Sequence, residues 1–524
     1  MTTAETNPAP TTAADAAAPA HEFHRLRPGS IGLVAVLFMA VANAAPITAM
    51  TGNVPIAVGY GNGIGAPAGF LVATVILTIF SIGYVAMAKH ITATGAFYGF
   101  ISHGLGRTTG FASGVVATLA YVVFEASLVG IFASFAKTLL PDFFISEFGW
   151  ALICVAVVAV LGYFEISISG IVLGVFLVGE IIMLGALALS VVIKGGGPDG
   201  FVFSALNPLN AFDAAPSTVA GGGAAVTATA AVGLFFAFWS WVGFETTAVY
   251  GEESKDPKTI VPRATLMAVI GLGVFYVLVS WLVIAGNGTD QAIAVSRGST
   301  GNSFDVFLDL TRANLGGPTE KIYEILACTG SFACAMAFHN AASRYLYAFG
   351  REGIISPLGR THGVHKSPHV ASITQSVITL AITLGFFFLQ DPTESAPDVF
   401  YFYQYGLLAI MGTMALLIVQ TICSVAVVCY FHVGKHHPES AHWFTTLTAP
   451  ILGAIGMAYV VYLLFDNLTF AAGAASGSPV FTATPYLVIG TFVAGVLGAL
   501  ALRQWAPAIY ERTGRVVMDD SHER

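Results

Sequence analysis

The residues with the clearest chemical potential lie at positions 234–262, where a carboxylic acid interrupts an apolar run. The segment reads LFFAFWSWVGFETTAVYGEESKDPKTIVP and places Gly243 and Glu245 where a membrane-spanning helix would meet the bilayer centre. A charge at that depth costs about 2.5–3.5 kcal/mol on insertion scales, so it usually faces a cavity or a protein partner. Irregular backbone is also tolerated there only where protein or a wet cavity covers it. We predict a broken transmembrane helix that lines a transport site.

Glu245 and two aromatic neighbours have competing interpretations. Glu245 can be a protonated bridge to another helix, the carrier of a coupled proton, or a cap for amides at the start of a second half-helix, where an acid is favoured. Trp239 can close the site as an aromatic gate or stack on a cationic substrate, and the alternative is simple packing. We assign Trp241 to packing.

Two further carboxylic acids and a histidine lie inside apolar runs. Glu125 follows Tyr121 by four residues, so both side chains can share one helix face. Glu125 can hold a substrate amine or relay a proton, or it can be a protonated carboxyl group bonded to a neighbouring helix. Glu180 offers the same choice, further from the expected site. His339 can titrate near neutral pH, although a lone histidine among helices is more often a packing residue.

The composition indicates a polytopic membrane protein. Of 524 residues, 56% are hydrophobic and 10% are charged, and the mean hydropathy is +0.78. Soluble domains carry about 25% charged residues. Basic residues are few and scattered, which argues against nucleic-acid binding. The sequence shows no nucleotide-binding motif, no cofactor motif, no metal-ligand spacing and no nucleophile–base pair, so we predict neither a cofactor or metal nor an enzyme. The five cysteines fall in apolar runs and are predicted to be reduced packing residues.

Twelve apolar runs define the predicted organisation. We expect a disordered cytoplasmic tail at 1–28, a first repeat of five spans at 29–194, an external linker at 195–223, a second repeat of five spans at 224–433, two further spans at 441–502 and a cytoplasmic tail at 503–524. With this arrangement, sixteen of the 21 Lys and Arg residues fall on the cytoplasmic side. The sequence therefore predicts a multi-pass protein of the plasma (inner) membrane with both termini cytoplasmic.

A second interruption lies five spans before the first. The span at 31–59 contains Asn43-Ala44-Ala45-Pro46, and an interior proline breaks or kinks a helix. Interrupted helices at corresponding positions of two halves point to a transporter binding site. There the positive end of a half-helix suits a carboxylate, and free carbonyls suit an ammonium group. The alternative for Pro46 is a kink without a ligand role.

Three motifs resemble one family of permeases. FWSWVGFETTAVYGEESKDPKTIVPRAT, at 238–265, resembles the sixth-span signature of the amino acid–polyamine–organocation superfamily, in which an aromatic helix breaks at Gly before Glu. The signature ends in a Glu-x-x-x-Pro-x-x-x-x-Pro turn, formed by Glu253, Pro257 and Pro262. FHNAASRYLYAFGREG, at 338–353, is similar to the end of span 8 in a bacterial branch, and ATGAFYGFISHGLGRTTGF, at 93–111, resembles the segment after span 2.

The resemblance implies an all-α membrane protein with twelve transmembrane helices: a five-plus-five inverted repeat with broken helices 1 and 6, and two C-terminal helices. It implies secondary transport of amino acids by alternating access, with proton symport as the first expectation. The alternatives are an amino acid or amine exchanger, a polyamine carrier and, in a different class, a transporter-like sensor or channel. The expected partners are an amino acid or amine substrate, a proton or sodium as coupling ion, and the bilayer, with the chain as a monomer or homodimer.

The resemblance also assigns the site residues. The predicted substrate-binding residues are Ala44, Ala45, Pro46, Ile47, Thr48, Tyr121, Glu125, Trp239, Gly243 and Phe338. The predicted gating or proton-coupling residues are Glu125, Glu180 and Glu245. The Ala-Ala-Pro-Ile-Thr run departs from the Gly-Ser-Gly-like run of many members. The first half of span 5 also lacks the Lys that mimics a sodium ion in some relatives.

Overall fold

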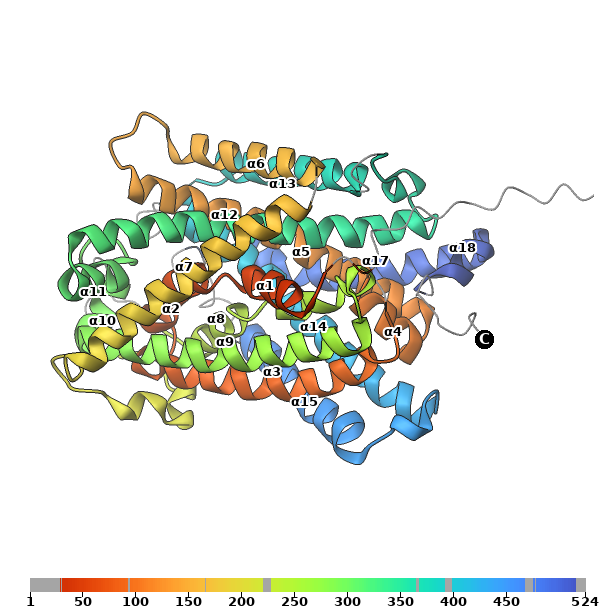
Figure 1. Cartoon of the computed structure of the whole chain (residues 1–524), viewed down its shortest axis with the longest axis horizontal. Helices are drawn as coiled ribbons and strands as arrows, with labels where there is room; N and C mark the ends of the chain where they lie inside the picture. Colours follow the sequence, from red (N-terminus) through yellow and green to blue (C-terminus); the bar gives the residue numbers. More distant parts are fainter. Residues whose placement is uncertain are drawn as a thin grey trace, which may run out of the picture.

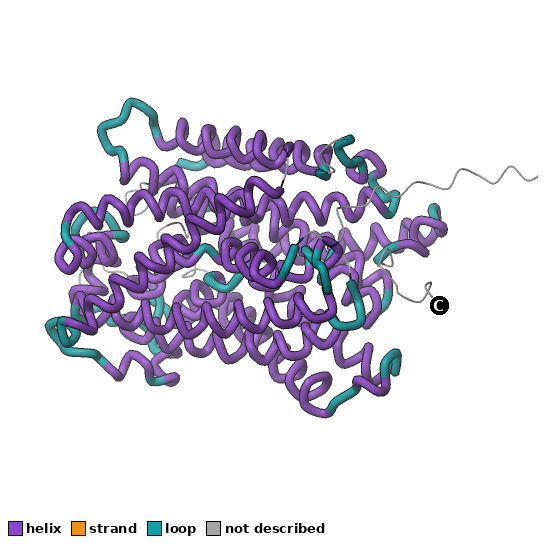
Figure 2. Tube along the Cα trace, viewed as in Figure 1, coloured by secondary structure: helices purple, strands orange, loops and turns teal. Residues whose placement is uncertain are grey.

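The structure, a computed structural model, describes residues 29, 31–92, 95–164, 166–219, 228–363, 367–391, 398–466, 475 and 477–514. These residues form helices and loops and, apart from two isolated bridges, contain no β-structure (Figure 2). The predicted tail at 1–28 and the predicted start of the sixth span at 224–227 lie outside the described residues. The predicted all-α membrane fold is confirmed.

Eleven helices of the described chain are long and apolar enough to cross a bilayer. They are Leu33–Tyr60, made of α1 (Leu33–Ala44) and α2 (Pro46–Tyr60); Gly63–Ala88, which contains α3 (Ala66–Ala88); α5 (Arg107–Leu139); α6 (Glu147–Phe164); Gly174–Ile193 within α7 (Ile166–Ile193); α9 (Pro257–Asn287); α12 (Gly317–Arg351); α13 (His369–Leu389); Val399–Val433, around α14 (Leu408–Val428); Trp443–Asp466, which ends in α15 (Ala449–Asp466); and α17 (Pro479–Trp505). The predicted sixth span is missing from this set because its helix, α8 (Ala230–Trp239), has only 10 residues. The described chain therefore shows eleven of the twelve predicted spans as long apolar helices.

The first span breaks at Ala45. Ala45 adopts a left-handed conformation with φ 40°, a region that non-glycine residues rarely occupy. Its N–H bonds back to the carbonyls of Val41 and Ala42, which ends α1. Pro46 then starts α2 at a position where its missing N–H costs nothing. The proline thus separates two half-helices.

The sixth span breaks just after Trp239. Gly243 has φ 119°, which an L side chain rarely adopts, and a short 3-10 helix, η4 (Phe244–Ala248), follows. A second, η5 (Gly251–Glu253), leads to α9, which begins at Pro257. Both predicted breaks are therefore present as changes of backbone direction.

The two breaks lie side by side in the middle of the molecule. α1 packs against η4, and α2 packs against α8. Around them, α6 and α13 lie together at one edge, while α3 and α15 lie together towards the other (Figure 1). α5 and α12 form the most extensive helix pair of the core, between the breaks and the α6–α13 edge. The long helices thus surround the two interruptions.

The segment between α9 and α12 folds into two short helices. They are α10 (Thr289–Ser296) and α11 (Asp305–Leu315). α11 buries Val306, Phe307, Leu308 and Leu310 on its apolar side. The short helix α4 (Phe97–Leu105) lies within the motif at 93–111, and α18 (Pro507–Arg512) follows α17.

Candidate functional site

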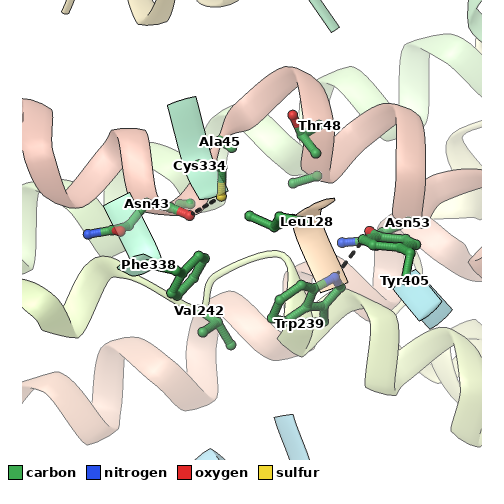
Figure 3. Close-up of a pocket in the computed structure, with 12 residues that line it drawn as sticks. Asn43, Ala45, Thr48, Asn53, Leu128, Trp239, Val242, Cys334, Phe338 and Tyr405 are labelled. Carbon is green, nitrogen blue, oxygen red and sulfur yellow. Dashed lines mark hydrogen bonds between the residues drawn. The ribbon is translucent and has the colours of Figure 1, made fainter. Parts of the chain in front are cut away.

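A small enclosed cavity lies where the two breaks meet (Figure 3). Its volume is about 20 Å³. A cavity of that size holds about one water molecule. It is lined by Asn43, Ala44, Ala45, Thr48, Ala49, Asn53, Leu128, Trp239, Val242, Cys334, Phe338 and Tyr405. The molecule is therefore closed around the site, and a ligand of amino acid size fits only after side chains move.

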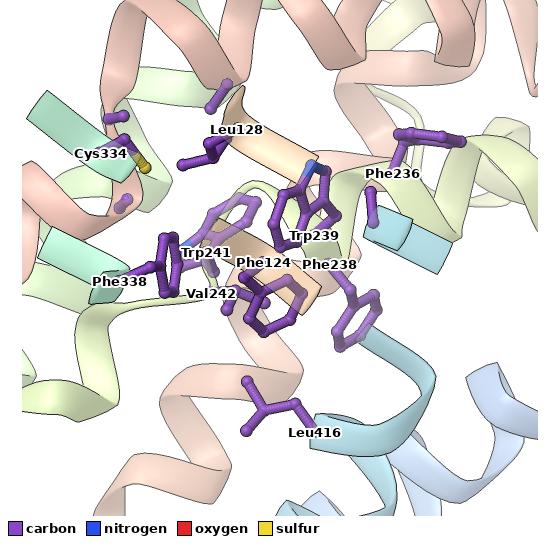
Figure 4. Packing of buried hydrophobic residues seen from close by; sticks show 14 of the residues in the cluster. Phe124, Leu128, Phe236, Phe238, Trp239, Trp241, Val242, Cys334, Phe338 and Leu416 are labelled. Atoms are coloured by element: carbon purple, nitrogen blue, oxygen red, sulfur yellow. The ribbon is translucent and has the colours of Figure 1, made fainter. Parts of the chain in front are cut away.

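Trp239 forms one wall of the cavity and is held on several sides. Its Nε1 donates a hydrogen bond of 3.1 Å to Oη of Tyr405, which in turn donates one of 2.5 Å to Oδ1 of Asn53. The indole stacks on Phe124 at 4.5 Å between ring centroids and lies 6.4 Å from Phe338 (Figure 4). Trp239 thus links the end of α8 to α5, α12 and the first span.

The two broken spans are bonded directly to each other. Asn43 Nδ2 donates to Oγ1 of Thr246 at 2.7 Å, and the Thr246 hydroxyl donates to the Gly243 carbonyl at 2.6 Å. A Cβ at Gly243 would lie 2.5 Å from Cβ of Asn43. Gly243 is therefore required both for its positive φ and for the close approach of the breaks.

Glu180 reaches the first break from α7. Its Oε2 accepts a hydrogen bond of 3.2 Å from the backbone N–H of Ile47, in the first turn of α2. The carboxyl group is buried, and the neighbouring Gly330 leaves room for it, because a Cβ there would lie 2.7 Å from Oε1. Glu180 lies closer to the site than its sequence position indicates and caps the second half-helix of span 1.

Glu245 lies within the break of span 6, at the start of η4. Its Oε1 accepts a hydrogen bond of 2.8 Å from the hydroxyl of Tyr121, and its Oε2 accepts one of 3.0 Å from the Gly243 N–H. These contacts agree with both the cap and the bridge interpretation, because one oxygen bonds the break and the other bonds α5. Tyr121 is oriented towards Glu245 and is not among the cavity-lining residues.

Glu125 belongs to a buried polar network outside the cavity wall. Its Oε1 lies 3.1 Å from Nδ1 of His339, and its Oε2 accepts a hydrogen bond of 2.6 Å from Nε2 of Gln375. The second ring nitrogen of His339 lies 2.8 Å from the hydroxyl of Ser372. The network therefore joins α5, α12 and α13. Glu125 and His339, considered separately in the sequence, form one pair.

The cavity contains half of the predicted substrate-binding residues: Ala44, Ala45, Thr48, Trp239 and Phe338. Pro46, Ile47 and Gly243 lie in the breaks without lining it. The other seven lining residues were not among the predicted ones: Asn43, Ala49, Asn53, Leu128, Val242, Cys334 and Tyr405. Asn43 and Asn53 are polar residues on either side of the predicted break, and that pattern is a usable signal. Nothing in the sequence marks Cys334, whose Sγ lies 2.9 Å from the Asn43 carbonyl, as a lining residue.

An ion pair lies beyond the cavity, where α12 ends. Arg344 Nη2 is 2.8 Å from Oε1 of Glu253, and its guanidinium carbon lies 4.9 Å from the ring centroid of Tyr250. Arg344 is buried. Glu253 is the acid of the Glu-x-x-x-Pro motif, so this motif connects the sixth span to the end of α12.

Residues 31–494 match the sequence model of a family described as amino acid permease. This chain belongs to the amino acid permease family. The resemblance to the amino acid–polyamine–organocation superfamily is thereby confirmed. The permease is 25% identical over 356 residues to a probable GABA permease of Pseudomonas aeruginosa, an alignment that covers 66% of the permease and 68% of the relative.

Other relatives align over shorter stretches. The permease is 28% identical over 157 residues to the branched-chain amino acid permease BcaP of Lactococcus lactis, which covers 30% of the permease and 31% of BcaP. The permease thus spans about a third of that relative and about two thirds of the Pseudomonas protein. Among solved structures, a manganese transporter of Eremococcus coleocola superposes with a TM-score of 0.59 at 12% identity, covering 91% of the permease and 95% of that chain. This likeness shows a shared transporter fold.

Proposed function

We propose that the permease moves a neutral amino acid across the plasma membrane by secondary active transport with alternating access, in symport with protons. The observation that carries the proposal is the position of the cavity, which lies where a half-helix end of span 1 meets the break in span 6. Such a junction offers a positive helix end to a carboxylate and free carbonyl groups to an ammonium group. No reacting side chain is needed.

Thr48 is the residue assigned to the substrate carboxylate. Pro46 has no N–H to offer, and the N–H of Ile47 is bonded to Glu180. The hydroxyl of Thr48 lines the cavity and is buried without a hydrogen-bond partner among the described residues. A buried polar atom without a partner costs free energy that a bound ligand recovers. Thr48 therefore supplies the donor at the amino end of α2.

The cavity lining favours a neutral side chain. None of its twelve lining residues is charged, and Ala44, Ala45, Ala49, Leu128 and Val242 give it small or apolar walls. A polyamine or a cationic amino acid would place a second ammonium group there without a carboxylate to meet it. The relatives named for GABA and branched-chain amino acids agree with a substrate without net charge. The polyamine carrier is the weaker alternative.

The coupled proton is assigned to the Glu125–His339 pair. Each residue directly follows a phenylalanine at the site: Phe124 stacks on Trp239, and Phe338 lines the cavity. Two titratable groups therefore lie immediately behind the aromatic wall that must move when substrate enters. Glu180 and Glu245, which cap the half-helices, are the alternative proton carriers.

Uptake into proteoliposomes tests the proposal. The purified permease is offered labelled neutral amino acids, cationic amino acids and polyamines, with and without an inside-alkaline pH gradient. We expect gradient-driven accumulation of a neutral amino acid. Uptake only into preloaded vesicles would show an exchanger instead. Preference for polyamines, or no uptake by folded and inserted protein, would overturn the assignment.

A further inference from the structure

A second cavity, with a volume of about 410 Å³, lies far from the central site, where α3 ends. It is lined by Ile82, Val85, Ala86, Lys89, His90, Leu266, Phe431, Ser440 and Thr445. α3 forms its floor, and α9 and the segment linking α14 to α15 form its sides. That linking segment projects from the bundle at this end (Figure 1). Cavities of 300–1,000 Å³ are typical of small-ligand sites.

Exposed aromatic side chains place the second cavity at the membrane–water interface. The span that begins at Trp443 exposes 67% of that residue and 38% of Phe444, and both precede the lining residue Thr445. Tryptophan and other aromatic side chains gather at the level of lipid headgroups. Lys89, at the end of α3, is exposed at the same end of the bundle. The cavity is therefore at headgroup depth.

The walls of the second cavity divide into an apolar part and a cationic part. Ile82, Val85 and Leu266 are apolar and lie on the spans. Lys89 lies at the other end and has no ion pair with an acid in the described part of the chain. Lys89 can extend its long stem along apolar surface while its ammonium group stays in water.

Further charged groups surround the cationic end. Lys258 and Arg263 are exposed in the first turns of α9, which also carries Leu266. The ring of His90 stacks on that of His437 at 4.1 Å, and His437 bonds to the exposed Glu439 at 2.9 Å. Burial, and then the neighbouring His437, lower the pKa of His90 from its usual 6.5, which favours the neutral ring. The positive charge comes from Lys89 and Arg263, and Glu439 partly offsets it.

We propose that this second cavity binds an anionic phospholipid, with its phosphate at Lys89 and the part of an acyl chain nearest the headgroup against Ile82, Val85 and Leu266. The His90 ring and the Ser440 hydroxyl are the hydrogen-bonding groups beside the phosphate. A basic pocket between transmembrane helices at headgroup depth suits an acidic headgroup. The apolar walls distinguish a lipid from a free phosphate ion, which would gain nothing from them. This site is independent of the substrate site and of the transported molecule.

Native mass spectrometry of the purified full chain tests the proposal. The permease is equilibrated in mixed micelles with dioleoylphosphatidylglycerol or dioleoylphosphatidylcholine, and bound lipid is counted. We expect preferential retention of the phosphatidylglycerol. Lys89→Gln should weaken retention about fivefold, the effect of one cation near a membrane surface. Ala86→Phe should weaken it with all charges kept, because the added ring fills the cavity.

Arg503→Gln is the matched control, because Arg503 is an exposed cation near the end of α17, which has no extensive contact with α3. It should retain the lipid as the unmodified chain does. Equal retention of the two lipids, or equal losses for Lys89→Gln and Arg503→Gln, would overturn the proposal. Displacement of the lipid by millimolar glycerol 3-phosphate would indicate a site for soluble phosphates instead. A loss of lipid retention in Lys89→Gln but not in Ala86→Phe would show that surface charge alone holds the lipid. That result would contradict binding in the cavity.

Discussion

Arg344 at the end of α12 and Glu253 after the sixth-span break form an ion pair, with Nη2 2.8 Å from Oε1. The backbone of Glu253 also accepts a hydrogen bond of 3.1 Å from the N–H of Ile31, just before α1. Both broken spans are thus tied to α12 at one end of the bundle. The predicted cytoplasmic N-terminus would place this connection on the cytoplasmic side.

Arg344→Gln should loosen this end of the molecule. Removal of one partner from a buried ion pair costs about 3–5 kcal/mol, because the remaining buried charge loses that partner. The reporter is Cys334, a buried free cysteine that lines the central cavity. In a variant with the other four cysteines replaced by alanine, Arg344→Gln should speed modification of Cys334 by a small thiol reagent. Arg344→Lys keeps the charge but loses the contact that Nε and Nη2 both make with Glu253. Its rate of Cys334 modification should lie between those of the unmodified chain and Arg344→Gln. An unchanged rate would contradict a closing role for the pair.

Trp239→Ala should reduce transport at least about tenfold, the effect of about 1.4 kcal/mol on the barrier, while folded protein is still obtained. The substitution removes both the stacking on Phe124 and the hydrogen bond to Tyr405. Initial uptake rates in proteoliposomes measure the loss. Trp239→Phe keeps an aromatic ring, and Tyr405→Phe removes only the hydrogen-bonding hydroxyl, so both should be milder. Normal transport by Trp239→Ala would exclude it as the gate.

Glu125→Gln should make uptake insensitive to an imposed pH gradient. The amide keeps the size of the side chain and an acceptor for Gln375 but cannot exchange a proton with His339. Ser372→Ala is the control, because it removes the other partner of His339 without removing a titratable group. Uptake by Glu125→Gln that follows the gradient as before would leave Glu125 as a packing residue.

Glu180→Ala should destabilise the permease by about 1–3 kcal/mol, because it leaves the buried N–H of Ile47 without an acceptor. Glu180→Gln keeps an acceptor oxygen and should be close to neutral for stability. Thermal unfolding in detergent compares the three proteins. If Glu180→Gln is stable but loses proton dependence, Glu180 would replace Glu125 as the proton carrier. Equal melting temperatures for all three would contradict the capping role.

Ionisation of the buried Glu352 should weaken its packing against the C-terminal segment as the pH rises, because the cost of burying the charge exceeds the gain from its hydrogen bonds. Burial raises the pKa of Glu352 from 4.5 to about 7, although hydrogen bonds from Tyr98 and from the Gly514 N–H oppose the shift. Since the folded-state pKa lies above the unfolded value, this stabilisation is complete below about pH 4.5 and is lost as the pH rises through about 7.

Tryptic cleavage after the exposed Arg512 reads out this contact. Measured against Glu352→Gln at each pH, cleavage of the unmodified chain should accelerate between pH 6 and pH 8, since the variant lacks the ionisation of Glu352 and shares the other titrating groups. The ratio of the two rates removes the pH dependence of the protease. A ratio that stays constant would show that Glu352 does not control the segment.

The sequence by itself determined the membrane class and the positions of both breaks. These features are local: hydropathy over about 20 residues marks a span, proline lacks an N–H wherever it stands, and Gly243 is the residue that tolerates a positive φ.

Only the tertiary structure decided which polar groups meet. Glu125 pairs with His339 across 214 positions, and Glu180 reaches Ile47 across 133. No periodicity within a helix encodes such pairs, since each helix fixes only which of its own residues share a face. Helix packing determines which residues of other helices that face contacts. It places Tyr405 and Cys334 in the wall of the central cavity. The breaks were therefore readable in advance, whereas the contacts that hold them together were not.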